Sequence, residues 1–312
     1  MPKRRKCHGE NKNKPGGLEN NKKERRNYII GDLGRTLEGY IVTAMMSTFM
    51  IFQGIDMTAV AGAMLVVKMI DAFDDVIFGY FVDRIHITEW KALKKITGEG
   101  KYLPWYRLTY FLFPIFTALF FCMPKGWSAG AKIVWFFVFY LLYDLTYTLV
   151  EVPMQSMIVT LTDNTDERNS ILQTKTIINS LATIGAGMLW TIAISEYVGI
   201  GIRDIALVSS VVFFFMMLPM CKGVKEHNTT LANVDPEENE KYSLKDMWNC
   251  IKTNKYLMVL LLSTVITSCL QTGSAVGLLV SYYHFGSSLV MAIPIVISLI
   301  PVIIAQMQTR KL

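Results

Sequence analysis

The sequence predicts an all-α membrane protein with about eight transmembrane helices. Hydrophobic residues make up 52% of the chain and charged residues only 18%, whereas soluble domains carry more charge and interrupt their apolar runs. The apolar runs are also long enough to cross a bilayer, which requires roughly 20 residues of helix. Composition and apolar length therefore both favour a membrane protein over a soluble globular domain.

The predicted transmembrane helices fall at about 30–53, 58–82, 104–124, 130–158, 171–196, 203–222, 257–283 and 287–307. Basic residues cluster in alternate links. The links 82–104 and 222–257 are rich in Lys and Arg, whereas 53–58 and 283–287 contain neither. By the positive-inside rule, this alternation predicts a multi-pass protein of the plasma membrane with both ends in the cytoplasm.

The chain divides into four predicted regions: a basic cytoplasmic tail (1–27), a six-helix bundle (28–222), a cytoplasmic central loop with an amphipathic helix (223–256), and the first two helices of a second bundle (257–312). The net charge of +6 arises in the tail. We interpret the tail as a positive-inside segment rather than a nucleic-acid-binding one, and we expect no nucleic-acid partner.

Acidic residues in the second predicted helix indicate a path for an ion or a solute. Burying an ionisable group in hydrocarbon costs about 3 kcal/mol or more, so such groups usually line a bundle interior. Asp71 and Asp75 are four residues apart and share one helix face, with Lys68 one turn earlier. Two carboxylates this close repel one another when both are ionised. A bound cation, a shared proton or Lys68 would relieve the repulsion.

The fourth predicted helix carries a polar stripe at helical spacing, formed by Asp144, Thr148, Glu151 and Gln155. Pro153 interrupts the helix and frees the backbone carbonyl of Leu149, a feature that membrane proteins tolerate beside a cavity. Oxygen ligands of this kind suit a hard cation such as Na⁺ better than a soft metal. In the first predicted helix, Arg35 and Glu38 are one turn apart and are candidates for an ion pair.

An enzyme is not expected. The sequence contains no nucleophile–base pair and no metal-ligand spacing, and none of its four histidines falls in the middle of a predicted helix. We therefore expect no cofactor beyond a coupling ion, Na⁺ or H⁺.

Four motifs together resemble the glycoside–pentoside–hexuronide:cation symporters of the major facilitator superfamily, the family of melibiose permease. They are Gly31-x-x-Gly34; Lys68-x-x-Asp71-Ala72-x-x-Asp75 followed by Gly79 and Asp83-Arg84; Gly100-Lys101-Tyr102-Leu103-Pro104-Trp105; and Thr146-Tyr147-Thr148-x-x-Glu151-Val152-Pro153 followed by Asp166-Glu167-Arg168. The resemblance extends over essentially everything from Tyr28 onward.

The resemblance implies a cation-coupled symporter of a sugar or glycoside, working as a monomer, and it implies a role for each matching residue. The implied cation ligands are Asp71, Asp75, Glu151 and Thr148. The implied solute contacts are Arg35, Thr36, Tyr147, Glu151, Gln155 and Lys175; the register leaves Thr176 as an alternative to Lys175. The implied gating residues are Gly79, Asp83 and Arg84.

Two departures from the family pattern leave the solute open. Thr36 stands where the melibiose transporter has an acid, and Gln155 stands where the family has a tryptophan. A less polar cargo such as a lysolipid is therefore an alternative, as is a membrane receptor or scaffold that does not transport. The family fold has twelve helices in two halves. We therefore expect the eight-helix sequence to be truncated at its C-terminal end.

Overall fold

The computed structural model describes residues 22–84, 87, 90–162, 164–227, 252–259 and 262–263, and a few single positions between 280 and 301. Some side chains inside the helices, including those of 68–69, 71–77, 80–81 and 83–84, also lie outside the description. The predicted tail up to residue 21, the predicted amphipathic helix of the central loop and most of the last two predicted helices are not covered. In the described part of the chain the regular structure is helical and contains no strand.

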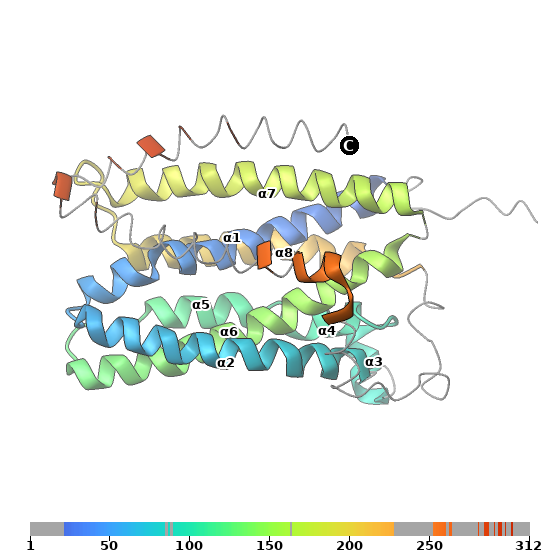
Figure 1. The fold of residues 1–312 in the computed structure, drawn as a ribbon, viewed down its shortest axis with the longest axis horizontal. Helices are drawn as coiled ribbons and strands as arrows, with labels where there is room; N and C mark the ends of the chain where they lie inside the picture. The colour runs from blue at the N-terminus through green and yellow to red at the C-terminus, as the bar shows by residue number, and fades with distance from the viewer. Residues whose placement is uncertain are drawn as a thin grey trace, which may run out of the picture.

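Eight helices make up the described bundle (Figure 1): α1 (Lys22–Phe52), α2 (Met57–Arg84), α3 (Lys91–Thr97), α4 (Leu103–Thr109), α5 (Leu112–Phe121), α6 (Ala129–Leu161), α7 (Thr165–Ile194) and α8 (Ile202–Gly223). The long helices run side by side along the longest axis of the molecule. α1 lies in the middle of the bundle and packs against α8 and α7, while α6 packs against α2, α4 and α5. Among the described residues, α6, α7 and α8 are long and apolar enough to cross a membrane.

Three boundaries differ from the sequence prediction. α1 begins at Lys22, inside the range predicted as a tail, and the basic link after α2 contains the short helix α3. The segment predicted as one helix over 104–124 is two helices, α4 and α5, separated at Tyr110 and Phe111. Pro114 explains the break, because its nitrogen cannot donate to the carbonyl four residues earlier and a continuous helix would lose that bond.

Pro153 lies inside α6 without ending it. The proline leaves the carbonyl of Leu149 without its helical donor, and the Thr109 hydroxyl of α4 donates a hydrogen bond to that carbonyl at 3.2 Å. One turn further along, the Tyr28 hydroxyl of α1 donates to the carbonyl of Met154 at 3.1 Å. A neighbouring helix thus satisfies the carbonyl that the proline frees, as a membrane interior requires, and the Tyr28 hydroxyl adds a contact between α1 and α6 beside the proline.

Glycines bring α1 close to α8. A Cβ placed on Gly31 would lie 2.5 Å from the Cβ of Met220, and one placed on Gly34 would lie 3.0 Å from the Cβ of Met216. Two turns after Gly31 on α1, the Ser210 hydroxyl of α8 donates to Glu38 Oε1 at 2.8 Å. Close backbone approach through glycine is typical of helix pairs inside membranes, and here it forms an extended contact between α1 and α8.

The four residues that follow α8, Val224–His227, form a strap across the end of the bundle that contains α3 and α4. The Glu226 carboxylate accepts hydrogen bonds from the backbone N–H groups of 101, 102 and 103 at 3.0, 2.8 and 2.5 Å. The Lys225 N–H donates to Glu24 Oε1 at 2.5 Å, and His227 Nε2 lies 2.9 Å from Glu24 Oε2. The His227 N–H also donates to the Thr160 carbonyl of α6 at 3.0 Å. The strap therefore joins the end of α8 to α1, α4 and α6.

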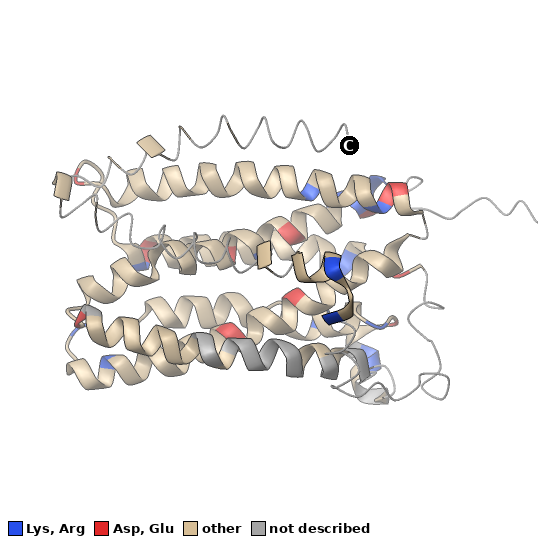
Figure 2. Cartoon of the chain, in the orientation of Figure 1, with Lys and Arg blue, Asp and Glu red and all other residues tan. Residues whose placement is uncertain are grey.

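Charged residues are concentrated near the ends of the bundle, but several lie part-way along the helices (Figure 2). Those inside the bundle include Asp32, Arg35 and Glu38 of α1 and Asp144 of α6, all of which are buried. Ionised groups in these positions require partners because hydrocarbon solvates charge poorly. The contacts of these buried charged residues therefore mark the candidate functional site.

Substitution of Gly31 by alanine is expected to destabilise the bundle by about 1–3 kcal/mol, because the new methyl group overlaps Met220 and forces α1 away from α8. Thermal unfolding of the purified protein in detergent measures the effect. Gly185→Ala in α7 is the matched control, since a Cβ there meets nothing within 4 Å. Equal melting temperatures for the two variants would show that the α1–α8 contact is loose at this point.

Candidate functional site

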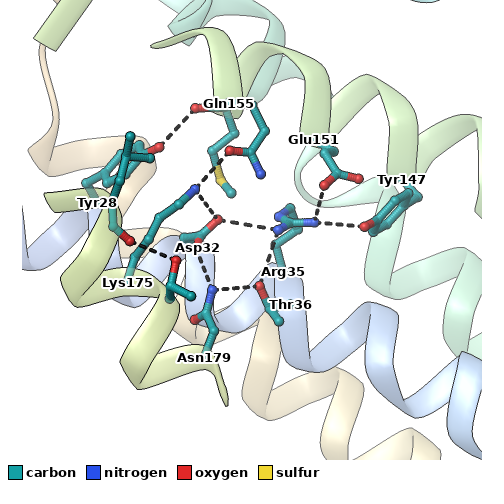
Figure 3. A network of polar contacts seen from close by, with 12 residues as sticks. Tyr28, Asp32, Arg35, Thr36, Tyr147, Glu151, Gln155, Lys175 and Asn179 are labelled. Atoms are coloured by element: carbon teal, nitrogen blue, oxygen red, sulfur yellow. Dashed lines mark hydrogen bonds and ion pairs between the residues drawn. The ribbon is translucent and has the colours of Figure 1, made fainter. Parts of the chain in front are cut away.

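A network of polar side chains joins α1, α6 and α7 inside the bundle (Figure 3). Its members are Tyr28, Asp32, Arg35 and Thr36 of α1, Tyr147, Glu151 and Gln155 of α6, and Lys175 and Asn179 of α7. The spacing within each helix explains the grouping. Residues three, four and seven apart share a face, so each helix directs a short polar stripe toward the other two.

Asp32 is at the centre of the network, and its side chain is 0% exposed. Its Oδ1 lies 3.4 Å from Arg35 Nη2 and 3.6 Å from Lys175 Nζ. Its Oδ2 accepts a hydrogen bond from Asn179 Nδ2 at 2.7 Å. One carboxylate therefore holds a guanidinium from its own helix and an ammonium and an amide from α7. Without Asp32, two positive charges would face each other in a buried site.

Arg35 connects α1 to α6. Its Nη1 lies 3.1 Å from Glu151 Oε1 and donates to the Tyr147 hydroxyl at 3.0 Å. Its Nη2 also donates to the Thr36 hydroxyl at 3.2 Å, and the guanidinium lies 5.6 Å from the centre of the Tyr147 ring. A planar guanidinium with several donors can hold two carboxylates at once, and Arg35 bridges Asp32 and Glu151 in this way.

Lys175 connects α7 to α6. Its Nζ donates to Gln155 Oε1 at 2.9 Å and lies 5.8 Å from the centre of the Tyr28 ring. Thr176, the alternative that the sequence register left open, is exposed, and its hydroxyl donates to the Leu172 carbonyl of its own helix. Lys175 is therefore the residue of α7 that reaches the network.

One side of the network is buried and the other side is open. Asp32, Arg35 and Lys175 are buried, whereas the side chain of Glu151 is 29% exposed and Gln155 is exposed. The edge presents a carboxylate, an amide and the phenol of Tyr147 beside the two bases. Such a set offers both donors and acceptors to a ligand rich in hydroxyl groups. Arg35 and Lys175 contact these groups from the buried side and orient them.

All six residues predicted as solute contacts lie in this network: Arg35, Thr36, Tyr147, Glu151, Gln155 and Lys175. Tyr28, Asp32 and Asn179 were not predicted. Helical spacing could have found the last two, because Asp32 is three residues before Arg35 and Asn179 is four residues after Lys175.

The predicted pairing of Arg35 with Glu38 is wrong. The Arg35 guanidinium is held by Asp32, Glu151 and Tyr147, and Glu38 instead accepts from Ser210 of α8. Residues three apart on a helix differ in direction by about 60°. Because of this difference in direction, the Arg35 side chain faces α6 and the Glu38 side chain faces α8.

The predicted cation ligands are only partly described. Glu151 lies in the network, and Thr148 is buried on α6 one turn before it. The side chains of Asp71 and Asp75 lie outside the described residues, although α2 is helical through both positions and packs against α6. Of the predicted gating residues, Gly79 is in α2, where an added Cβ meets no described atom within 4 Å. The side chains of Asp83 and Arg84 are not described.

Comparison with known proteins gives one family and several relatives. Residues 27–307 match the family described as "MFS/sugar transport protein". The chain is 27% identical to the isoprimeverose transporter of Lactiplantibacillus pentosus, over 81% of this chain and 51% of the relative. It is 26% identical to a putative sulfoquinovose importer of Escherichia coli strain K12, over 81% and 52%. It is 28% identical to a glucuronide carrier protein homolog of the same strain, over 50% and 32%.

The chain spans about half the length of the first two of these relatives, and about a third of the third. The matched part includes α1, α6 and α7 and therefore the polar network. The printed names of these three relatives refer to sugars or sugar derivatives.

Substitution of Asp32 by asparagine is expected to destabilise the protein by about 3–5 kcal/mol, because Lys175 loses its carboxylate in a buried site and faces Arg35 directly. Thermal unfolding measures the loss. Glu99→Gln is the control, since Glu99 is 86% exposed and pairs with Lys94 at the surface, where such a pair contributes about 0–1 kcal/mol.

The double variant Asp32→Asn, Lys175→Met tests the cause. Removing both charges is expected to recover a large part of the stability lost in Asp32→Asn alone. Strictly additive losses would contradict the assigned role of Asp32.

Proposed function

The chain belongs to the MFS/sugar transport protein family, and from this premise we propose that the protein is a cation-coupled secondary active symporter of a sugar or glycoside. It is a multi-pass membrane protein, and membership of this family supports transport rather than enzymatic chemistry. The observation that carries the proposal is the open edge of the polar network. Glu151, Gln155 and Tyr147 present hydrogen-bonding groups there, and Arg35 and Lys175 support them from the buried side.

The solute binds at this edge in the proposal, and its hydroxyl groups take the place of water. Arg35, Thr36, Tyr147, Glu151, Gln155 and Lys175 are the proposed contacts. Asp32 and Asn179 position them, since Asp32 holds both bases and Asn179 donates to Asp32 and to the Thr36 hydroxyl, the latter at 3.1 Å. The names of the relatives support a sugar or sugar derivative as the solute.

The coupling ion, Na⁺ or H⁺, binds between α2 and α6 in the proposal, on Asp71, Asp75, Glu151 and Thr148. Carboxylate and hydroxyl oxygens are the ligands that a hard cation prefers. Glu151 would belong to both sites, because Arg35 already holds one of its oxygens at 3.1 Å. A cation that draws Glu151 toward α2 weakens its pairing with Arg35 and leaves the guanidinium free to bind the solute. Binding of either ligand then favours the other.

We propose further that the complete transporter is a twelve-helix monomer of the plasma membrane. The described α1–α8 would form its first half, with α4 and α5 together as one interrupted span, and the N-terminus would be cytoplasmic. In this arrangement the open edge of the network faces the cavity between the halves, where symporters of this architecture bind their solute. Gly79, Asp83 and Arg84 would control the cytoplasmic gate.

The coupling proposal predicts that Asp75→Asn and Glu151→Gln each abolish gradient-driven accumulation, so that the solute only equilibrates across the membrane. Uptake of a radiolabelled sugar by proteoliposomes, with an imposed Na⁺ or H⁺ gradient, measures this. Glu99→Gln, at an exposed surface pair, should accumulate solute as the unmodified protein does. Accumulation that survives in both site variants would remove these carboxyl groups from the coupling site.

The solute proposal predicts stabilisation of the purified protein by a sugar. A ligand at about 100 times its Kd adds about 2.7 kcal/mol to the stability of the folded state, and the effect should grow when Na⁺ is present. Isoprimeverose, a glucuronide and sulfoquinovose are the sugars to compare, with a lysolipid beside them. If only the lysolipid stabilises the protein, a lysolipid would replace a sugar as the proposed solute. If none of the four ligands stabilises it, a receptor or scaffold would be favoured over a transporter.

A further inference from the structure

Glu38 is a second buried acid of α1, apart from the network around Asp32. Its side chain lies at the contact between α1 and α8, and the residue is 0% exposed. Oε1 accepts a hydrogen bond from the Ser210 hydroxyl at 2.8 Å. Oε2 is also buried and has no hydrogen-bond partner among the described residues. Within the described part of the chain, one oxygen of this carboxyl group is therefore satisfied and the other is not.

Among the residues that the structure describes, the groups that face Glu38 supply no positive charge. They are the Ser210 hydroxyl of α8, the Thr117 hydroxyl of α5 and the Tyr143 phenol of α6. Tyr143 also lies near Asp144, a further acid of α6. On α1 itself Arg35 is one turn away, but its guanidinium is held by Asp32 and Glu151.

A count of charges shows why Glu38 differs from the other acids of the network region. Asp32 and Glu151 are matched by Arg35 and Lys175, so that these two acids and two bases balance. Glu38 is left over among the described side chains, without a basic partner within ion-pair distance. An ionised carboxylate in that position would be desolvated and uncompensated, which is the costliest way to bury an acid.

We propose that Glu38 is a proton-binding site, which carries its proton on Oε2 at neutral pH and so keeps the contact between α1 and α8 uncharged. Oε1 is then the carbonyl oxygen of a carboxylic acid, and a carbonyl is a good acceptor for the Ser210 hydroxyl. The described contacts of Glu38 are with Ser210 and Thr117 and do not include Glu151. Loss of the proton places a bare negative charge beside the closely packed glycine face of α1 and weakens its contact with α8.

Infrared spectroscopy of the purified protein at pH 7 tests the proposal, because a protonated carboxyl group has a C=O stretching band that a carboxylate lacks. Glu38→Gln is expected to remove one such band, while Glu151→Gln, at an acid paired with Arg35, leaves it in place. Glutamine has the shape of a neutral glutamic acid, so Glu38→Gln should fold and melt like the unmodified protein. Ser210→Ala is expected to move the band to higher frequency, because the carbonyl loses its donor.

Three results would overturn the proposal: no acid band lost in Glu38→Gln, a band that does not move in Ser210→Ala, or a band that disappears in Asp144→Asn instead. Ser210→Ala keeps Glu38, so the assignment can be judged even where Glu38→Gln is poorly produced. The measurement uses neither solute nor ion gradient. A missing band therefore rejects the proton site and leaves the symport proposal intact, and failed uptake leaves the band unaffected.

Discussion

The carboxylate of Asp32 is the interaction on which the rest of the polar network depends. Two basic side chains point into the same buried space from α1 and α7, and they would repel each other at short range in a medium that screens poorly. Asp32 lies within 3.4 Å of one and 3.6 Å of the other. Because Asp32 neutralises them from the buried side, Arg35 and Lys175 can extend toward Glu151 and Gln155 on α6. The open edge of the site is thus ordered by a residue that a solute would not touch.

Packing between helices supplies the second constraint. The glycines of α1 allow α8 to approach closely, and this contact fixes the direction in which each side chain of α1 leaves the helix. Asp32 and Arg35 then face α6 and α7, while Glu38 faces α8. Two acids six residues apart on one helix consequently have different surroundings. One is surrounded by bases and an amide, and the other by hydroxyl groups.

Much of the fold could be predicted from apolar length and link charge. The predicted helix at 130–158 corresponds to α6 and the one at 203–222 to α8, with small differences at the ends. The break between α4 and α5 was not predicted because Phe111 and its neighbours continue the apolar run, and hydropathy does not register a lost backbone bond at Pro114. Resemblance singled out six residues that lie together in the polar network, and their role as solute contacts stays a prediction. It could not identify Asp32 or the true partners of Arg35, because side-chain direction depends on how α1, α7 and α8 pack.

The strap after α8 has a mechanical consequence. Glu226 accepts hydrogen bonds from three consecutive backbone N–H groups at the start of α4. Glu24 of α1 contacts both the Lys225 amide and the His227 ring. A tether of only four residues has little slack. In a transporter of two bundles, a displacement of the chain beyond His227 would reach α1, α4 and α6 together, because these contacts hold the tether to all three helices. The end of α8 and these three helices would then move as one unit.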